Sequence, residues 1–169
     1  MTATRREEIV DAFIKVSTRK GLDNTTMQDV AKTVGISVGT IYLDFKNKDE
    51  LIDAFIRRIF EQMDLYIERI LSQSASVEKK LHDLLVGEVA FASEQMRQNR
   101  SLFDFFHNNV VKHIRKNIKE DRIEFEEKRI NLVKQVLDQG IREGSFMIED
   151  PAETARLFFL AFGILHGPM

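Results

Sequence analysis

The chain has no cysteine among its 169 residues. This absence excludes disulfide bonds, thiolate zinc sites, iron–sulfur clusters and cysteine nucleophiles. Only two prolines and eight glycines are present, so long helices are expected in place of many short strands with turns.

The longest apolar stretch runs from Leu157 to Leu165 and falls well short of the roughly 20 residues that cross a bilayer. The N-terminus has no apolar run behind its arginines, which excludes a secretory signal. We therefore expect a soluble, cytoplasmic protein with no membrane partner.

The chain also lacks a strong charge of either sign. It carries 25 Lys and Arg against 27 Asp and Glu, for a formal charge of −2. Residues 1–50 likewise hold equal numbers of bases and acids. Any binding of nucleic acid must therefore come from a local basic patch. Such a patch would require Arg5, Arg6, Lys46 and Lys48 to gather on one face, with partial positive charge added by helix N-termini.

Apolar residues recur at spacings of three and four along almost the whole chain, which predicts helices. Thr26 with Asp29, and Asn47 with Glu50, form patterns typical of helix starts, and Asp150-Pro151 is another. No strand pattern is present, so the predicted fold class is all-α. The predicted helices cover about residues 4–20, 27–34, 37–45, 48–72, 81–98, 102–117, 130–144 and 151–165.

The most informative block runs from Thr26 to Tyr42. Two short helices are separated there by a tight turn that begins at Gly35, which is the helix-turn-helix arrangement. Thr40 and Tyr42 can donate hydrogen bonds to phosphates. The second helix begins with side chains small enough to approach base edges, namely Ser37, Val38, Gly39 and Thr40.

This block resembles the signature of TetR-type transcriptional regulators. The resemblance covers about residues 5–55 and rests on Gly35–Tyr42, Phe45 and Lys48–Leu51, with Thr26 and Val30-Ala31 upstream. It implies a three-helix DNA-binding head over residues 1–46 and a helical ligand-binding and dimerising body over residues 47–169. It also implies a repressor that acts as a homodimer on double-stranded operator DNA and is released by a small molecule.

The resemblance assigns roles residue by residue. Thr26 would cap the second helix and touch a phosphate, and Lys48 would bind a phosphate at the start of the fourth helix. Ser37, Val38 and Gly39 occupy the positions that face bases, and Thr40 and Tyr42 those that contact bases or phosphates. Two departures stand out. Leu43 replaces the aromatic or histidine common at its position, and the chain ends at Met169 where the family usually continues into a further helix. That final helix of the family is therefore expected to be missing, or the dimer is built differently.

The body is rich in phenylalanine, with 13 in the chain and no tryptophan. A set of largely apolar residues that would line a pocket favours a lipophilic or aromatic effector, although plain core packing is the alternative for each member. His113 is six residues from His107, so the two lie on different helix faces and predict no metal site. We expect no cofactor and no catalytic residues. The candidate ligand-binding residues are Phe55, Ile59, Phe60, Met63, Phe91, Met96, Phe103, Phe106, His107, Val110, Phe159 and Phe162.

Two hypotheses of different class remain open. In the first, a ligand that wedges against the stripe of Phe55, Ile59 and Met63 tilts the helix that starts at Lys48 and changes the separation of two recognition helices. In the second, the chain is a helical ligand-carrier or protein-interaction module whose helix-turn-helix is architectural. The neutral head and the apolar side chains of Val38, Ile41 and Leu43 favour the second.

Overall fold

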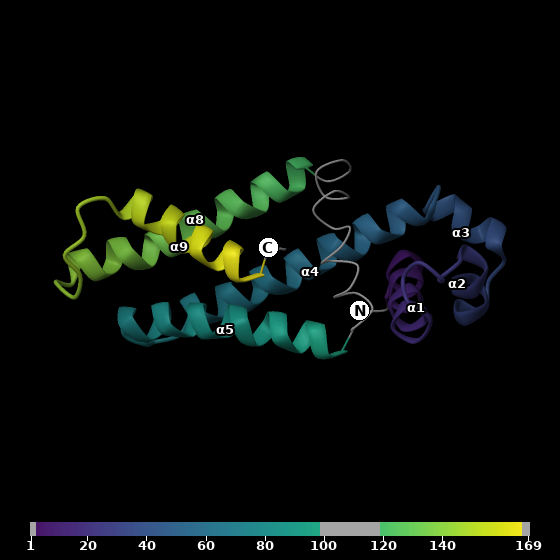
Figure 1. The fold of residues 1–169 in the computed structure, drawn as a ribbon, viewed down its shortest axis with the longest axis horizontal. Coiled ribbons are helices and arrows are strands. Elements are labelled where there is room, and N and C mark those ends of the chain that lie inside the picture. The colour runs from purple at the N-terminus through teal and green to yellow at the C-terminus, as the bar shows by residue number, and fades with distance from the viewer. Residues whose placement is uncertain (1–2, 99–118, 167–169) are drawn as a thin grey trace. The chain divides into compact units, whose positions relative to one another are not determined.

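The computed structural model describes residues 3–98 and 119–166 (Figure 1), and every regular element in these ranges is a helix. The all-α prediction is confirmed. The predicted helix over residues 102–117 lies outside the described residues. None of the helices in the two described ranges is long and apolar enough to span a membrane. The helices are α1 (Arg5–Lys20), α2 (Met27–Val34), α3 (Val38–Asp44), α4 (Lys48–Leu71), α5 (Val77–Gln98), α8 (Lys119–Arg142) and α9 (Pro151–His166).

Side chains at the predicted helix starts bind the backbone N–H groups that have no partner inside a helix. At α1, the Glu7 amide donates to Thr4 Oγ1 over 3.3 Å and the Thr4 amide donates to Glu7 Oε2 over 2.6 Å. At α4, the Glu50 amide donates to Asn47 Oδ1 over 2.9 Å. At α9, Asp150 Oδ1 accepts from the amides of Ala152 and Glu153, each over 2.9 Å. These starts were predictable because each one depends on residues two to three positions apart.

The start of α8 was predicted wrongly. The apolar periodicity begins at Ile130, but the helix begins at Lys119. The intervening residues are mostly Glu, Lys and Arg, which favour helix but bury little. These residues form no apolar stripe from which the start of the helix could be predicted. Packing then comes from single residues such as Phe125, whose ring stacks on Phe60 of α4 with centroids 4.2 Å apart.

The chain divides into two compact units. Within the described residues, the first unit contains α1, α2, α3, the part of α4 up to Ile59 and the end of α5 from Gln95. The second contains α4 from Phe60, α5 up to Glu94, α8 and α9. The division in packing therefore falls inside α4. The predicted boundary between residues 46 and 47, which was based on the expected roles of the helices, stays a prediction.

The core of the second unit gathers one face from each of its four helices. The helices α8 and α9 lie side by side (Figure 1). Because each helix buries a single stripe, the unit needs all of them to exclude water from this core. Its buried residues are Met63, Ile67 and Ile70 of α4, Val77 and Leu84 of α5, Val133, Val136 and Leu137 of α8, and Ala155 of α9.

Helix α8 ends in a turn that requires glycine at Gly140. The carbonyl of Gly140 accepts from the amides of Ser145, over 2.8 Å, and Phe146, over 3.1 Å. The turn passes through Gly144 at φ +76°, a left-handed conformation that favours glycine. These bonds hold the Phe146 ring against Gly140, where a Cβ would lie 2.2 Å from Phe146 Cδ2.

We expect Gly140→Ala to destabilise the protein by about 1–3 kcal/mol because the added methyl group overpacks a pinned ring. Thermal or denaturant unfolding followed by circular dichroism measures this. The matched control is Gly39→Ala in α3, where a Cβ would meet only Ser37 Oγ at 3.6 Å. That change should leave stability unchanged or raise it by up to about 1 kcal/mol. Equal stability of Gly140→Ala and the wild type would contradict the packing argument.

Candidate nucleic-acid interface

The turn between α2 and α3 is built around two hydrogen bonds to one carbonyl. The amides of Gly35, over 2.9 Å, and Ile36, over 3.1 Å, both donate to the Ala31 carbonyl. Gly35 adopts φ 84° and ψ 27°, the left-handed conformation that ends many helices. The chain therefore reverses within a few residues and delivers Ser37 as the first capping residue of α3, as the helix-turn-helix pattern predicts.

Helix α3 is short, and its residues divide sharply between buried and exposed. The Thr40 amide donates to Ser37 Oγ over 3.0 Å, and the two hydroxyl oxygens lie 2.8 Å apart. Ile41 is fully buried, whereas Tyr42 and Leu43 keep 50% and 79% of their surface exposed. The side chains of Val38 and Thr40 are half-buried, and Ser37 and Gly39 are exposed. The helix is thus anchored by Ile41 and presents Gly39, Tyr42 and Leu43 to solvent.

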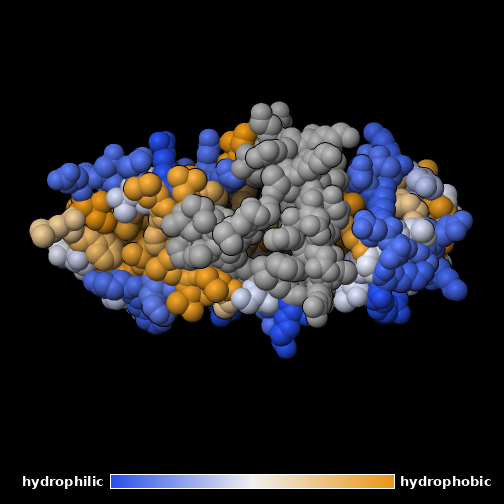
Figure 2. All heavy atoms as spheres, in the orientation of Figure 1, coloured by the Kyte–Doolittle hydropathy of each residue, from blue (hydrophilic) through white to orange (hydrophobic). Residues whose placement is uncertain are grey.

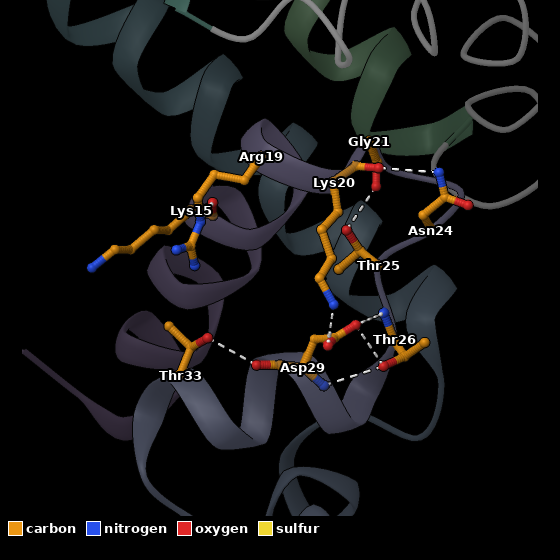
Figure 3. Close-up of polar contacts among 9 residues, drawn as sticks. All are labelled: Lys15, Arg19, Lys20, Gly21, Asn24, Thr25, Thr26, Asp29 and Thr33. Atoms are coloured by element: carbon orange, nitrogen blue, oxygen red, sulfur yellow. Dashed lines mark hydrogen bonds and ion pairs between the residues drawn. The ribbon is translucent and has the colours of Figure 1, made fainter.

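Thr26 caps α2 as predicted, through a reciprocal pair of bonds with Asp29 (Figure 3). The hydroxyl of Thr26 donates to Asp29 Oδ2 over 2.8 Å and accepts from the Asp29 amide over 3.2 Å. Lys20, at the end of α1, donates to Asp29 Oδ1 over 2.5 Å. Hydrogen bonds from Lys20 and Thr26 lower the pKa of Asp29 from 3.8 to about 2. The capping role is confirmed, and the phosphate contact of Thr26 stays a prediction.

The arginines at the start of α1 bind the end of α3. Arg5 Nε donates to Asp44 Oδ2 over 2.6 Å, and Arg5 Nη2 donates to Asp44 Oδ1 over 3.0 Å. Arg6 Nη1 donates to the Asp44 carbonyl over 2.5 Å, and its guanidinium lies 4.1 Å from the centroid of the Phe45 ring. We call this arrangement the arginine clamp. The hydrogen bond from Arg5 holds the pKa of Asp44 below its ordinary value.

The ammonium of Lys48, the first residue of α4, binds backbone carbonyls and is not free in solvent. Its ammonium donates to the carbonyls of Leu22, over 2.5 Å, and Asp23, over 3.2 Å. The side chain is half-buried, and burial lowers the pKa of Lys48. An ammonium has a third N–H, so the phosphate contact of Lys48 stays a prediction. Together with the arginine clamp, this contact shows that Arg5, Arg6 and Lys48 do not form an unpaired basic patch.

Other cations on the first unit remain open to solvent. Among the residues that the structure describes, the ammonium groups of Lys15, Lys32 and Lys46 have no bonding partner and are exposed. Figure 3 shows Lys15 extending away from the contacts around Asp29, while Arg19 Nε donates to the Lys15 carbonyl over 3.3 Å. Lys32 lies on α2 and Lys46 directly follows the end of α3. These three lysines are available to an anionic partner.

The predicted ligand-binding residues fall into three groups. Phe55 and Met63 are buried, and Ile59, Phe60 and Phe159 are half-buried. For Phe91, Met96 and Phe162 only the helical backbone belongs to the described part. The remaining candidates, Phe103, Phe106, His107 and Val110, lie outside the described residues.

Two of these candidates join a connected cluster in the second unit that the sequence did not indicate. Phe60 stacks on Phe125. The guanidinium of Arg129 lies 5.1 Å from the Phe125 centroid and 5.2 Å from the Phe159 centroid. Phe125 and Arg129 were missed because they lie in the charged part of α8, where no apolar period identifies an inward face.

Two family models match the chain. The model described as bacterial regulatory proteins, tetR family, matches residues 9–55, and the model described as tetracyclin repressor-like, C-terminal domain, matches residues 77–169. The first match covers the helix-turn-helix, and the second covers more than half of the chain. Both halves of the sequence are therefore similar to the same kind of protein.

Individual relatives agree with the family models. The chain is 27% identical over 161 residues to the uncharacterised HTH-type transcriptional regulator YhgD of Bacillus subtilis, covering 92% of this chain and 78% of the relative. It is 25% identical over 145 residues to the HTH-type transcriptional repressor KstR2 of Mycolicibacterium smegmatis, covering 85% and 68%. Its fold is similar to that of the regulator FadR of Bacillus subtilis in complex with stearoyl-CoA, with a TM-score of 0.63, 23% identity and coverage of 93% and 82%.

We expect the contacts of Asp29 to make stability depend on pH in a defined window. A carboxylate whose pKa falls from 3.8 to about 2 on folding stabilises the native state above pH 4, and this contribution is lost as the pH drops toward 2. The thermal midpoint of Asp29→Asn should therefore lie below that of the wild type between pH 5 and 7. The difference should shrink as the pH is lowered from about 4 to about 2.

Thermal melts at a series of pH values, followed by circular dichroism, test this prediction. The control is Glu61→Gln, which neutralises an exposed carboxylate in the middle of α4, and its midpoint should follow the wild type at every pH. A constant difference between wild type and Asp29→Asn across the whole range would show that the ionised carboxylate is not what matters.

Proposed function

Because this chain belongs to the TetR family of bacterial regulatory proteins, we propose that it acts as a homodimeric repressor that a lipophilic small molecule releases from its operator. As a member of this family it is a DNA-binding transcriptional regulator. The observation that supports the DNA-binding part most directly is the division of α3 into one buried anchor, Ile41, and an exposed face that carries Ser37, Gly39 and Tyr42.

In this proposal, the start of α3 enters the major groove of the operator. Ser37, Val38 and Gly39 meet base edges, and the absence of a side chain at Gly39 lets the helix backbone approach the duplex. Thr40 and Tyr42 contact bases or phosphates, and Tyr42 does so through its half-exposed phenol. Thr26 brings the N-terminus of α2, with its partial positive charge, toward a phosphate.

The charge needed for this binding comes from few residues. Residues 1–50 have no excess of bases over acids, and the arginine clamp uses Arg5 and Arg6 internally. Lys32 and Lys46 carry unpaired ammonium groups on α2 and directly after α3. We therefore propose a modest number of phosphate contacts, with sequence preference coming from the small side chains of α3. Because bacterial operators are reached in the cytoplasm, we place the protein there.

A lipophilic effector is favoured by the aromatic character of the second unit. Phe60 and Phe159 belong to the cluster around Phe125 and Arg129, and Met63 lies in the adjoining core. The regulator FadR, whose fold this chain shares, was solved with stearoyl-CoA. We propose that the predicted ligand-binding residues, including those outside the described ranges, line a site for a molecule with a long or aromatic apolar part.

Release would act through α4, which contributes residues to both units. An effector that binds two arrangements of α4 with different affinity shifts the population between them. The recognition helices of a dimer must match half-sites about 34–36 Å apart or a multiple of that spacing, so a displacement of a few ångströms is enough to weaken operator binding.

We expect Tyr42→Phe to weaken operator binding about tenfold or more, because it removes one hydrogen bond to a charged phosphate. The affinity is measured on a duplex that the protein selects from a random pool, at several salt concentrations. The logarithm of the wild-type association constant should fall linearly with the logarithm of salt, by roughly 0.9 for each phosphate contacted.

The control variant is Gln62→Ala, which changes an exposed side chain of α4 and should bind like the wild type. Selection of no duplex at all, or an affinity indifferent to salt and to Tyr42→Phe, would contradict operator binding through α3. That outcome would favour the alternative in which the helix-turn-helix is architectural.

The proposed dimer rests on apolar residues exposed along α9. Leu157 and Leu160 keep 57% and 59% of their surface exposed in the single chain, and they lie one helical turn apart. Figure 2 shows apolar residues gathered on the surface over α9 and the nearby part of α5. A monomer would expose this patch to water, which favours its burial against a second copy.

We expect Leu160→Glu to convert a dimer into a monomer at micromolar concentration, because it would bury an unpaired charge in the contact. Sedimentation equilibrium measures the change. The matched control is Leu65→Glu on α4, where Leu65 is 67% exposed, and this variant should remain a dimer. A monomeric wild type, or dissociation by both variants alike, would refute a dimer through the C-terminal helices.

A further inference from the structure

The α1–α2 loop (Gly21–Thr26) follows the C-terminus of α1, where helix carbonyls need partners from outside the helix. Asn24 Nδ2 donates to the Lys20 carbonyl over 3.1 Å, and Thr25 Oγ1 donates to the Gly21 carbonyl over 2.8 Å (Figure 3). The Thr25 amide donates to the Leu22 carbonyl over 3.2 Å. The loop thus supplies donors to the last carbonyl of α1 and to two carbonyls of its own, those of Gly21 and Leu22.

Lys48 completes this set from another helix. Its ammonium binds the carbonyl of Leu22 and also that of Asp23, for which no other donor is found within the described residues. Leu22 and Thr25 are almost fully buried, so the loop is fixed against the interior of the first unit. The two hydrogen bonds from Lys48 form a non-covalent cross-link between segments that are distant in sequence, residues 22–23 and residue 48.

The position of Lys48 is unfavourable for a lysine that serves only to solvate a surface. A cation at the first residue of α4 opposes the dipole of that helix, and half-burial removes part of its hydration. The lowered pKa of Lys48 reflects this burial. What compensates is the pair of loop carbonyls at Leu22 and Asp23, shortly after the C-terminus of α1, which accept both hydrogen bonds.

We infer that Lys48 is a positioning residue that ties the first turn of α4 to the α1–α2 loop, and that it supports DNA binding through this bond rather than by pairing with a phosphate. The inference rests on the proposed function and specifies how α4 acts on the head. The loop leads directly into the Thr26 cap of α2, and α2 leads through Gly35 into α3. When α4 moves, the loop carbonyls held by Lys48 move with it.

Three variants separate a positioning role from a phosphate contact. Lys48→Met keeps the length of the side chain and removes every donor. Lys48→Gln keeps a neutral donor that can bind a carbonyl but displaces no counterion from DNA. Lys46→Met is the matched control because Lys46 is an exposed lysine, two residues away, whose ammonium has no partner among the described residues.

The first measurement is operator affinity against salt. We expect Lys48→Met to bind about tenfold more weakly at every salt concentration with an unchanged salt slope, and Lys48→Gln to recover part of the loss. A decrease of about 0.9 in the slope for both Lys48 variants would mean that a phosphate contact had been lost, and it would overturn the inference. Lys46→Met shows the size of the slope change for a lysine that lies on the surface.

The second measurement needs no DNA. Amide hydrogen exchange over residues 22–26 should be faster in Lys48→Met than in the wild type, and close to the wild type in Lys48→Gln and Lys46→Met. Unchanged exchange in Lys48→Met would overturn the inference even if operator binding is weakened. A protein that binds no operator but shows this exchange pattern would contradict the proposed function and leave the cross-link in place. If Lys48→Met does not fold but Lys48→Gln does, the side-chain donor is needed for folding, and this result supports the same positioning role.

Discussion

The carboxylate and the carbonyl of Asp44 fix the end of α3 by accepting hydrogen bonds from Arg5 and Arg6. A helix of seven residues is far below the length that is stable by itself in water, so the recognition helix exists only because its ends and its single buried side chain are held from outside. Its start is held by the Ala31 carbonyl and the Ser37 cap, its middle by Ile41 and its end by the arginine clamp. The exposed face of α3 is a consequence of these attachments.

Several charged side chains of the first unit therefore hold its helices in position and are not free to bind a partner. Exposed ion pairs contribute little free energy, and the pair of Arg5 with Asp44 is half exposed on the arginine side. Its value lies in orientation, because a two-bond contact between a guanidinium and a carboxylate admits few relative positions. Lys20 on Asp29 and Lys48 on the loop carbonyls act in the same way at other joints of the unit. These contacts occupy several of the bases within residues 1–50, where bases and acids are equal in number.

Much of the fold could be predicted from sequence, and the reason is local. The caps at Thr4, Thr26 and Asp150 depend on residues two to three positions apart, so the pattern that creates them is visible in a short window. The buried stripe of α4 was visible because it repeats over several turns. The start of α8 was missed because its first turns are charged and carry no stripe. Within the candidate site, the turn at Gly35 and the capping role of Thr26 were predicted, whereas the partners of the cations were not.

The sequence alone determined most of the helical segments, where the helix-turn-helix lies and which family the chain resembles, because helix caps, glycine turns and apolar periods depend on neighbours along the chain. Only the tertiary structure decided that Arg5 and Arg6 bind Asp44, that Lys48 binds the loop after α1, and that Phe60 meets Phe125. Each of these contacts joins residues more than twenty positions apart. The sequence does not distinguish a lysine or arginine that faces solvent from one that binds a phosphate or a carbonyl. Its partner depends on how the helices pack.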